Sequence, residues 1–231
     1  MWLDTTIRHR IASRLVRAAT RGISTVCGLG TLDPIGNLHQ TREGDLFRID
    51  IRHPAIEPLT FYHRGTAADL GVIRQIFLAH DYLLNRFRQH KWVDVHYNEM
   101  LKAGRKPVIV DAGANIGLGS LYLSRRFPEA RVVAIEPSAS NCAVLTKNLS
   151  TIDARIHHAA IHSAADSIEL VDPQQGEWGY STYKSSSLPQ GTLETVQCLK
   201  FRDLLEEGED ALVLKVDIEG GEMNEFSDLK Y

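Results

Sequence analysis

Three apolar segments in the second half of the chain predict buried parallel strands. Each is a short run rich in branched aliphatic residues that ends in a carboxylate, at 108–111, 131–136 and 211–217. Continuous runs of this kind, without polar alternation, are typical of strands that are covered on both faces. Segments with apolar residues at helical spacing follow the first two runs, one from Leu118 and one from Asn141. Alternating strands and helices predict an α/β domain with a doubly wound parallel sheet.

Further elements extend this domain. Residues 154–161 predict a third strand, and 167–171 and 195–199 predict two more on either side of a polar loop, 172–193. A loop of about twenty residues is long for a compact domain, which favours a lid or a substrate-binding loop. A plain surface loop is the alternative. Phe201 and the leucines after it predict a short helix before the last strand.

The first half of the chain has a different pattern. Residues 46–51 and 59–62 alternate between apolar and polar positions, which predicts an antiparallel pair of strands. Residues 28–44 have the composition of a loop, with turn signals at Asp33–Pro34 and Gly36–Asn37. Residues 69–82 have the apolar spacing of a helix.

Near the N-terminus, apolar residues at helical spacing stand among arginines. This pattern predicts a basic amphipathic helix that docks on its own domain. A membrane-surface or targeting segment is the alternative. We therefore divide the chain into an accessory region with a helical and β-hairpin extension, residues 1–104, and an α/β domain, residues 105–231.

A glycine-containing turn follows the first strand of the domain, between Asp111 and Gly117. Because glycine has no Cβ, Gly113 and Gly117 let the backbone turn sharply and let a ligand approach closely. Such a turn at the carboxyl end of a parallel strand is a common place for a nucleotide-like cofactor. A dinucleotide site is one alternative, although glycines at 113, 117 and 119 do not match the G-x-G-x-x-G spacing. A strand-to-helix connection without a ligand is the other.

A second carboxylate, on Glu136, ends the next strand of the pattern. In nucleotide-binding folds an acid at this place accepts hydrogen bonds from the ribose hydroxyls. A carboxylate suits this task because it only accepts hydrogen bonds, whereas a vicinal diol can donate two. A solvated glutamate at the end of a strand is the alternative. Pro137 follows directly, and Ser138 has the position of a helix N-cap.

The last strand ends in a cluster of three acids, Asp217, Glu219 and Glu222. Carboxylates this close in sequence repel one another unless a cation, a ligand or a shared proton offsets their charge. Lys215 is close enough in sequence to neutralise part of it. A solvated acidic turn is the alternative.

Together, the sequences D-A-G-A-N-I-G, A-I-E-P and L-K-V-D-I-E-G-G-E resemble the FkbM-type methyltransferase family in their order and spacing. Residues 64–77 are similar to that family's lead-in, with one residue more than the usual form between Thr66 and Asp69. The resemblance covers roughly residues 45 to 225, and its last motif is the most specific part.

The resemblance implies the Rossmann-like sheet of class I methyltransferases and methyl transfer from S-adenosylmethionine. The acceptor it implies is usually a hydroxyl on a sugar, a polyketide or a similar metabolite. Since the reaction has to align the acceptor and remove one proton, we expect Asp217 to be the catalytic residue, with Glu219 and Glu222 orienting it or binding the acceptor. We expect the cofactor to be bound by Asp111, Gly113, Ala114, Asn115, Gly117, Glu136 and Pro137.

Composition narrows the functional classes only slightly. The net charge of −3 and a pI of about 6.4 give no basic field that would indicate nucleic acid. The three cysteines are isolated, which predicts reduced thiols in a cytoplasmic protein. We expect no transmembrane segment, because no apolar run approaches the ~20 residues that a spanning helix needs. The histidines are scattered, so we expect no metal.

The sequence stops at Tyr231, soon after the acidic motif, whereas sheets of this class have further strands. We therefore expect an incomplete domain whose missing strands belong to a longer chain or come from a partner, or else a degenerate fragment. An open sheet edge would favour self-association. A non-catalytic cofactor-binding or interaction module is the alternative function, and a dehydrogenase is a third.

Overall fold

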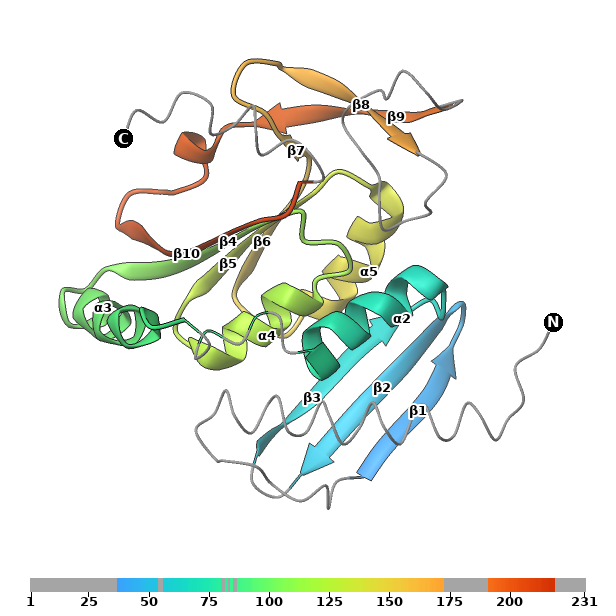
Figure 1. Cartoon of the computed structure of the whole chain (residues 1–231), viewed down its shortest axis with the longest axis horizontal. Helices are drawn as coiled ribbons and strands as arrows, with labels where there is room; N and C mark the ends of the chain where they lie inside the picture. The colour runs from blue at the N-terminus through green and yellow to red at the C-terminus, as the bar shows by residue number, and fades with distance from the viewer. Residues whose placement is uncertain are drawn as a thin grey trace. The chain divides into compact units, whose positions relative to one another are not determined.

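The computed structural model describes residues 37–53, 56–79, 82, 84, 87–172 and 191–218. The chain divides into two compact units, residues 1–86 and 87–231, which we call the front unit and the sheet unit (Figure 1). The predicted basic helix near the N-terminus and most of the loop 172–193 lie outside the described residues. Within the described residues, no helix is both long enough and apolar enough to cross a membrane.

The front unit contains a three-stranded antiparallel sheet. Its strands are β1 (Asn37–Glu43), β2 (Leu46–His53) and β3 (Ile56–His63), in the order β1-β2-β3. The predicted pairing of 46–51 with 59–62 is confirmed. The prediction of a loop over 28–44 is wrong for β1, which forms a hairpin with β2. The residues from Gln40 to Glu43 are all exposed, so this edge strand has no apolar alternation that would identify it.

A helix follows this sheet. The helix α2 (Ala67–Ile73) continues into a π-helical segment, η1 (Arg74–Ala79), so the predicted helix over 69–82 is confirmed in part. Thr66 caps α2 by accepting a hydrogen bond from the amide of Asp69. Phe77 stacks on Phe61 with the ring centroids 5.3 Å apart, and both side chains are buried.

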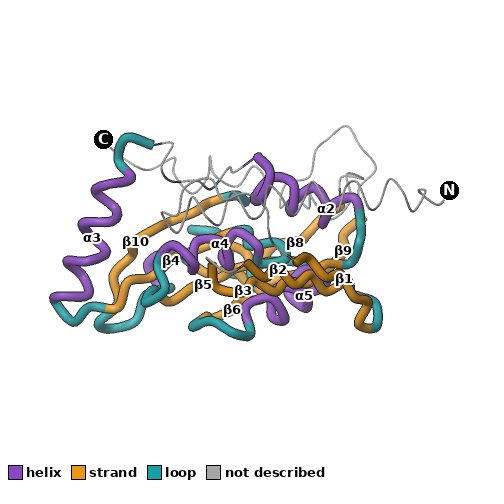
Figure 2. The backbone as a smooth tube through the Cα atoms, turned by 90° about the horizontal axis from the view of Figure 1, so that it is seen from below, coloured by secondary structure: helices purple, strands orange, loops and turns teal. Residues whose placement is uncertain are grey.

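The sheet unit contains four parallel strands in the order β10-β4-β5-β6. This result confirms the predicted α/β class with a parallel sheet. Figure 2 shows β10, β4 and β5 as neighbouring strands, with α3 alongside β10. In chain order, the elements are α3 (His90–Lys102), β4 (Lys106–Ala112), α4 (Leu118–Arg126), β5 (Arg131–Glu136), α5 (Ala139–Leu149), β6 (Ala154–His158) and β10 (Glu209–Val216).

The two faces of the sheet are covered differently. The helices α4 and α5 pack against each other and against the central strands. On β4, the side chains of Val108, Val110 and Ala112 belong to a buried hydrophobic cluster. Leu204 is part of the same cluster, and the partly buried Phe201 packs against it. The short 3-10 helix η3 (Phe201–Asp203) lies where the sequence predicts a short helix, and it helps to cover the face of the sheet that carries these β4 side chains.

A small second sheet lies beside the parallel one. It contains β7 (Ala160–Ile161), β8 (Ser167–Asp172) and β9 (Gly191–Leu199), in the order β7-β9-β8. The predicted strands at 167–171 and 195–199 are confirmed as an antiparallel pair. The predicted single strand 154–161 is wrong, because the chain changes sheets at Ala159, whose amide donates to the carbonyl of Glu136.

Strand β10 is at the end of the four-stranded order among the described residues. Its Leu214 side chain is 48% exposed, although the neighbouring strand β4 is almost fully buried. Self-association through this edge stays a prediction. The helix α3 belongs to the sheet unit, which begins at residue 87. The sequence-based boundary at 104–105 differs from this division and stays a prediction.

Candidate functional site

The glycine turn lies between β4 and α4, as the sequence predicts. Three of its residues have a left-handed backbone: Gly113 with φ 76°, Asn115 with φ 52° and Gly117 with φ 81°. L-residues other than glycine and asparagine rarely adopt this conformation. Gly117 also faces α5, where an added Cβ would lie 3.2 Å from the Leu145 side chain. These positions therefore require residues that tolerate a left-handed backbone, and position 117 also requires a residue without a Cβ because α5 lies so close.

The amides of this turn donate within the chain itself. Ile135 accepts from the first two at 2.9 and 3.0 Å, and the Glu136 carboxylate accepts from the third at 2.8 Å. A diphosphate-binding loop aims its amides at the ligand. These amides are directed inward, so the geometry does not favour the dinucleotide alternative. The backbone amides of the turn that donate within the chain are those of Gly113, Ala114, Asn115, Ile116 and Gly117.

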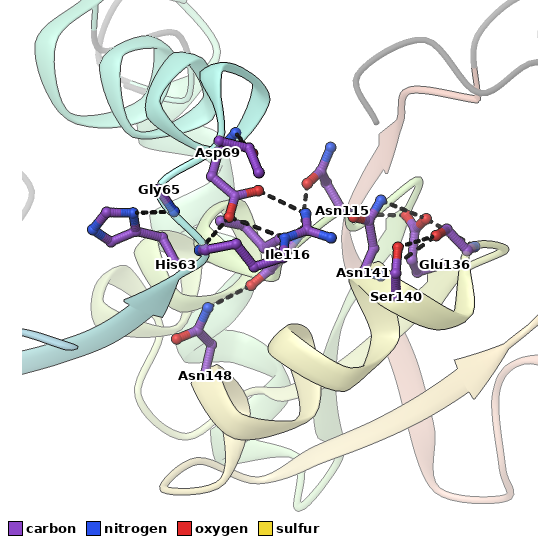
Figure 3. Close-up of polar contacts among 12 residues, drawn as sticks. His63, Gly65, Asp69, Asn115, Ile116, Glu136, Ser140, Asn141 and Asn148 are labelled. Carbon is purple, nitrogen blue, oxygen red and sulfur yellow. Dashed lines mark hydrogen bonds and ion pairs between the residues drawn. The ribbon is translucent and has the colours of Figure 1, made fainter. Parts of the chain in front are cut away.

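Glu136 connects the first turn with the second. Its buried carboxylate accepts hydrogen bonds from the amide of Asn115 at 2.8 Å, from the amide of Ser138 at 3.0 Å and from Nδ2 of Asn141 at 3.1 Å (Figure 3). Burial raises the pKa of Glu136, and these hydrogen bonds oppose that rise. A carboxylate has about four acceptor positions, so three donors do not exhaust it. Ribose binding by Glu136 stays a prediction.

Two asparagines of α5, whose role was not predicted from the sequence, hold the turns. Asn141 binds Glu136, and Asn148 donates from Nδ2 to the carbonyl of Ile116 at 2.6 Å (Figure 3). Both amides are buried on the same side of the helix, seven positions apart. Polar residues on an otherwise apolar helix face are the signal that could have identified them, since a buried amide needs a partner. Ser138 caps α5 by accepting from the amide of Asn141, which confirms the predicted N-cap.

Asp111 lies below the turn and is fully buried. Its Oδ2 accepts from the hydroxyl of Ser120 at 2.6 Å, and its Oδ1 lies 2.9 Å from Nζ of Lys215. The contact with Lys215 is an ion pair without hydrogen-bond alignment at Oδ1. Lys215 also donates to the carbonyl of Gly113. The lysine thus joins β10 to both the acid and the turn, a role that the sequence suggested only as partial neutralisation of the acids.

Asp217 follows β10 immediately and lies against the turn. Its amide donates to the carbonyl of Ala112 at 3.0 Å, while its side chain is half exposed. Its Oδ2 is 3.8 Å from Nζ of Lys215. The structure thus places one of the three predicted acids of this cluster. Glu219 and Glu222 lie outside the described residues.

The small sheet adds a carboxylate next to Pro137 that was not predicted from the sequence. Glu194 of β9 accepts from the amide of Ala139 at 3.0 Å and lies 3.5 Å from Nε2 of His158. His158 in turn lies 2.9 Å from the carbonyl of Pro137. These contacts fix the start of α5. Their partners are far apart in the chain, so no local pattern indicates them.

The donor set determines which ligand the site can accept. The carboxyl ends of β4, β5 and β10 bring together three carboxylates, on Asp111, Glu136 and Asp217, with one ammonium group on Lys215. Acceptor oxygens on Glu136 and Asp217, beside the buried Asp111–Lys215 pair, fit a ligand that has hydroxyl donors and a positive charge. S-adenosylmethionine, with its ribose, amino group and sulfonium, fits this description.

Comparison with known proteins gives local matches. Methyltransferase sdnD of Sordaria araneosa is 46% identical over 59 residues, which cover 26% of this chain and 23% of sdnD. Methyltransferase 1 of Beauveria bassiana is 27% identical over 138 residues, which cover 50% of this chain and 55% of that protein. The chain spans about half the length, or less, of these curated relatives.

Among solved structures, the plantazolicin methyltransferase BpumL in complex with SAH is similar at 15% identity and a TM-score of 0.28, over 71% of this chain and 48% of BpumL. A family model described as the methyltransferase FkbM domain matches residues 111–230, just over half of the 231-residue chain. That range begins at Asp111 and includes all three strand-end acids of the site. The chain belongs to the FkbM methyltransferase family.

Proposed function

We propose that this chain binds S-adenosylmethionine at the turn from Asp111 to Gly117 and takes part in methyl transfer to a hydroxyl oxygen of a sugar or another small metabolite. The observation that carries the proposal is that three neighbouring parallel strands each have a carboxylate at the carboxyl end, on Asp111, Glu136 and Asp217. Membership of the FkbM methyltransferase family supports methyl transfer as the chemistry.

The proposed cofactor site is built from Asp111, Gly113, Ala114, Asn115, Gly117, Glu136 and Pro137, among which Asp111 is fully buried under the turn. When bound, S-adenosylmethionine supplies a methyl group that its sulfonium already activates. Glu136 has acceptor capacity left after its three protein donors, and it would accept from a ribose hydroxyl. The turn is held in shape by its own hydrogen bonds, so it would present a preformed surface to the cofactor.

Asp217 is the proposed base. Its carboxylate is half exposed and therefore accessible to an acceptor molecule. Asp217 would accept the hydroxyl proton of the acceptor while the bound cofactor supplies the methyl group. A positioned base of this kind contributes about 10²- to 10⁴-fold to a rate. Glu219 and Glu222 are proposed to orient the base or bind the acceptor.

Calorimetry on the full chain tests the cofactor, with S-adenosylmethionine and NAD in separate titrations. We expect saturable binding of S-adenosylmethionine alone. Binding of NAD alone would support a dehydrogenase, and binding of neither would support an interaction module; either result overturns the proposal.

Release of S-adenosylhomocysteine with a panel of monosaccharides and hydroxylated metabolites tests the reaction. We expect Asp217→Asn to lower turnover about 10²-fold or more while cofactor affinity stays close to the wild-type value. Asp203→Asn is the matched control, since Asp203 is also exposed and follows no strand of the parallel sheet. Equal turnover in the wild type and Asp217→Asn would remove Asp217 from the mechanism.

A further inference from the structure

A buried ion pair lies directly beneath the proposed cofactor turn. Asp111 of β4 and Lys215 of β10 are register partners in the parallel sheet, and their charged atoms are 2.9 Å apart. The Asp111 side chain is 1% exposed and that of Lys215 is 12% exposed. Charges at this depth are costly unless they are paired, so each residue requires the other.

The protein contacts both carboxylate oxygens of Asp111, although only Oδ2 accepts a hydrogen bond. One oxygen accepts from Ser120 on α4, and the other is paired with the Lys215 ammonium. A ligand amino group would have to compete with Lys215 for the same oxygen in a site without solvent access. This geometry differs from the simplest interpretation of the sequence, in which Asp111 binds the cationic amino end of the cofactor.

Lys215 connects the pair with the rest of the site. Its ammonium donates to the carbonyl of Gly113 and lies 3.8 Å from the Asp217 carboxylate. The same side chain thus contacts the end of β4, the first glycine of the turn and the proposed base. A displacement of this ammonium would change the cofactor turn and the acidic segment together.

We propose that Lys215 is a positioning residue, and that Asp111 and Lys215 act as one neutral unit that sets the Gly113 turn, without direct binding of the cofactor's amino group by Asp111. This inference rests on the proposed cofactor site. It predicts that the two residues are coupled, so that the loss of one is offset by the loss of the other.

The test is a double-mutant cycle with Asp111→Asn, Lys215→Met and the double variant. Urea unfolding and calorimetric titration with S-adenosylhomocysteine are measured on each protein. We expect each single change to weaken binding about tenfold or more, because it leaves a buried charge unpaired. We expect the double variant to return to within about threefold of the wild type.

The cycle Arg105→Met with Asp210→Asn is the matched control. In this exposed pair, Nη2 of Arg105 lies 2.6 Å from Oδ1 of Asp210, at the opposite ends of the same two strands. We expect these substitutions to leave the affinity for S-adenosylhomocysteine unchanged. If Lys215→Met fails to fold, Lys215→Gln retains a donor for the Gly113 carbonyl and serves in its place.

Two results would overturn the inference. A double variant that binds as weakly as Asp111→Asn would make Asp111 a direct ligand. A Lys215→Met protein with a lower unfolding midpoint but unchanged affinity would make the pair purely structural. If the wild type binds no S-adenosylhomocysteine, the proposed function fails, and the unfolding data alone still measure whether the two residues are coupled.

Discussion

A Cβ atom on Gly113 would lie 1.8 Å from the carbonyl oxygen of Asp217. The backbone of the acidic segment therefore crosses directly over the first glycine of the turn, and the amide of Asp217 fixes this crossing by donating to Ala112. Any side chain at position 113 would have to displace backbone, which is less adaptable than the far end of a side chain. The cofactor turn and the proposed base are thus parts of one packed unit.

Gly113→Ala should destabilise the protein more than the strain of its left-handed backbone alone explains. Gly104 is the control, since it also has positive φ, at +69°, and has open space around the position of a Cβ. We expect Gly104→Ala to cost about 1–2 kcal/mol and Gly113→Ala to cost about 1–3 kcal/mol more, from overpacking. Urea unfolding of both variants measures the difference. Equal losses would show that the acidic segment can yield.

Glu136→Gln should change how stability depends on pH. Burial raises the pKa of Glu136, so the folded protein holds its proton more tightly than the unfolded chain does. The stability that the protonated group contributes is present below the ordinary glutamate pKa of about 4.3 and is lost as pH rises through the raised value. Glutamine is neutral at every pH. As pH rises through this range, the wild type should therefore lose unfolding free energy relative to Glu136→Gln. If the unfolding free energies of the two proteins change in parallel with pH, the raised pKa is contradicted.

Glu209 should give the opposite dependence at the other end of the sheet. Its buried carboxylate, at the start of β10, lies 3.0 Å from Nη1 of Arg131 and 2.7 Å from Nη2 of Arg155. Burial alone would raise the pKa of Glu209, but the Glu206 amide and these guanidinium groups hold it below its usual value.

The stability from Glu209 is thus present above the ordinary glutamate pKa and is lost as pH falls through the lowered value. We expect Glu209→Gln to lower the unfolding free energy at neutral pH by about 2–4 kcal/mol and to flatten the loss of stability in acid. Asp210→Asn removes an exposed carboxylate from the same strand and should lower the unfolding free energy much less than Glu209→Gln does. Identical acid unfolding of the wild type and Glu209→Gln would contradict this role.

Cys142 should resist alkylation in the folded protein. Burial raises the pKa of its thiol to about 12, and the thiol donates to the carbonyl of Glu136. Since the thiolate is the reactive form, iodoacetamide at mildly alkaline pH should label the half-buried Cys198 well before Cys142. Mass spectrometry of peptides, with urea-unfolded protein as the control, measures both sites. Rapid labelling of Cys142 without urea would show that α5 opens locally.

The strands of the parallel sheet and their terminal acids were predictable because their cause is local. A buried parallel strand needs a continuous apolar run, and a carboxylate at its end is visible in the sequence. The glycine turn was predictable for the same reason, since left-handed backbone restricts the residue type at 113 and 117.

The contacts between motifs were not predictable. Lys215 and Asp111 belong to strands that are adjacent in the sheet but far apart in the chain, and no local pattern specifies that register. The break at Ala159 depends on β9, which pairs with β7 from a distant part of the chain. Strand β1 lacked a signal because its described side chains are exposed and polar.

The position of β10 in the chain affects the order in which parts of the protein can fold during synthesis. It is the last described strand in the chain, yet it supplies Lys215, and leads directly into Asp217, beside a turn that is synthesised about one hundred residues earlier. A nascent chain that has completed β4, β5 and β6 still lacks the ammonium group that neutralises Asp111. Non-local pairing of this kind is slow, so the proposed cofactor site should form only after β10 has been synthesised.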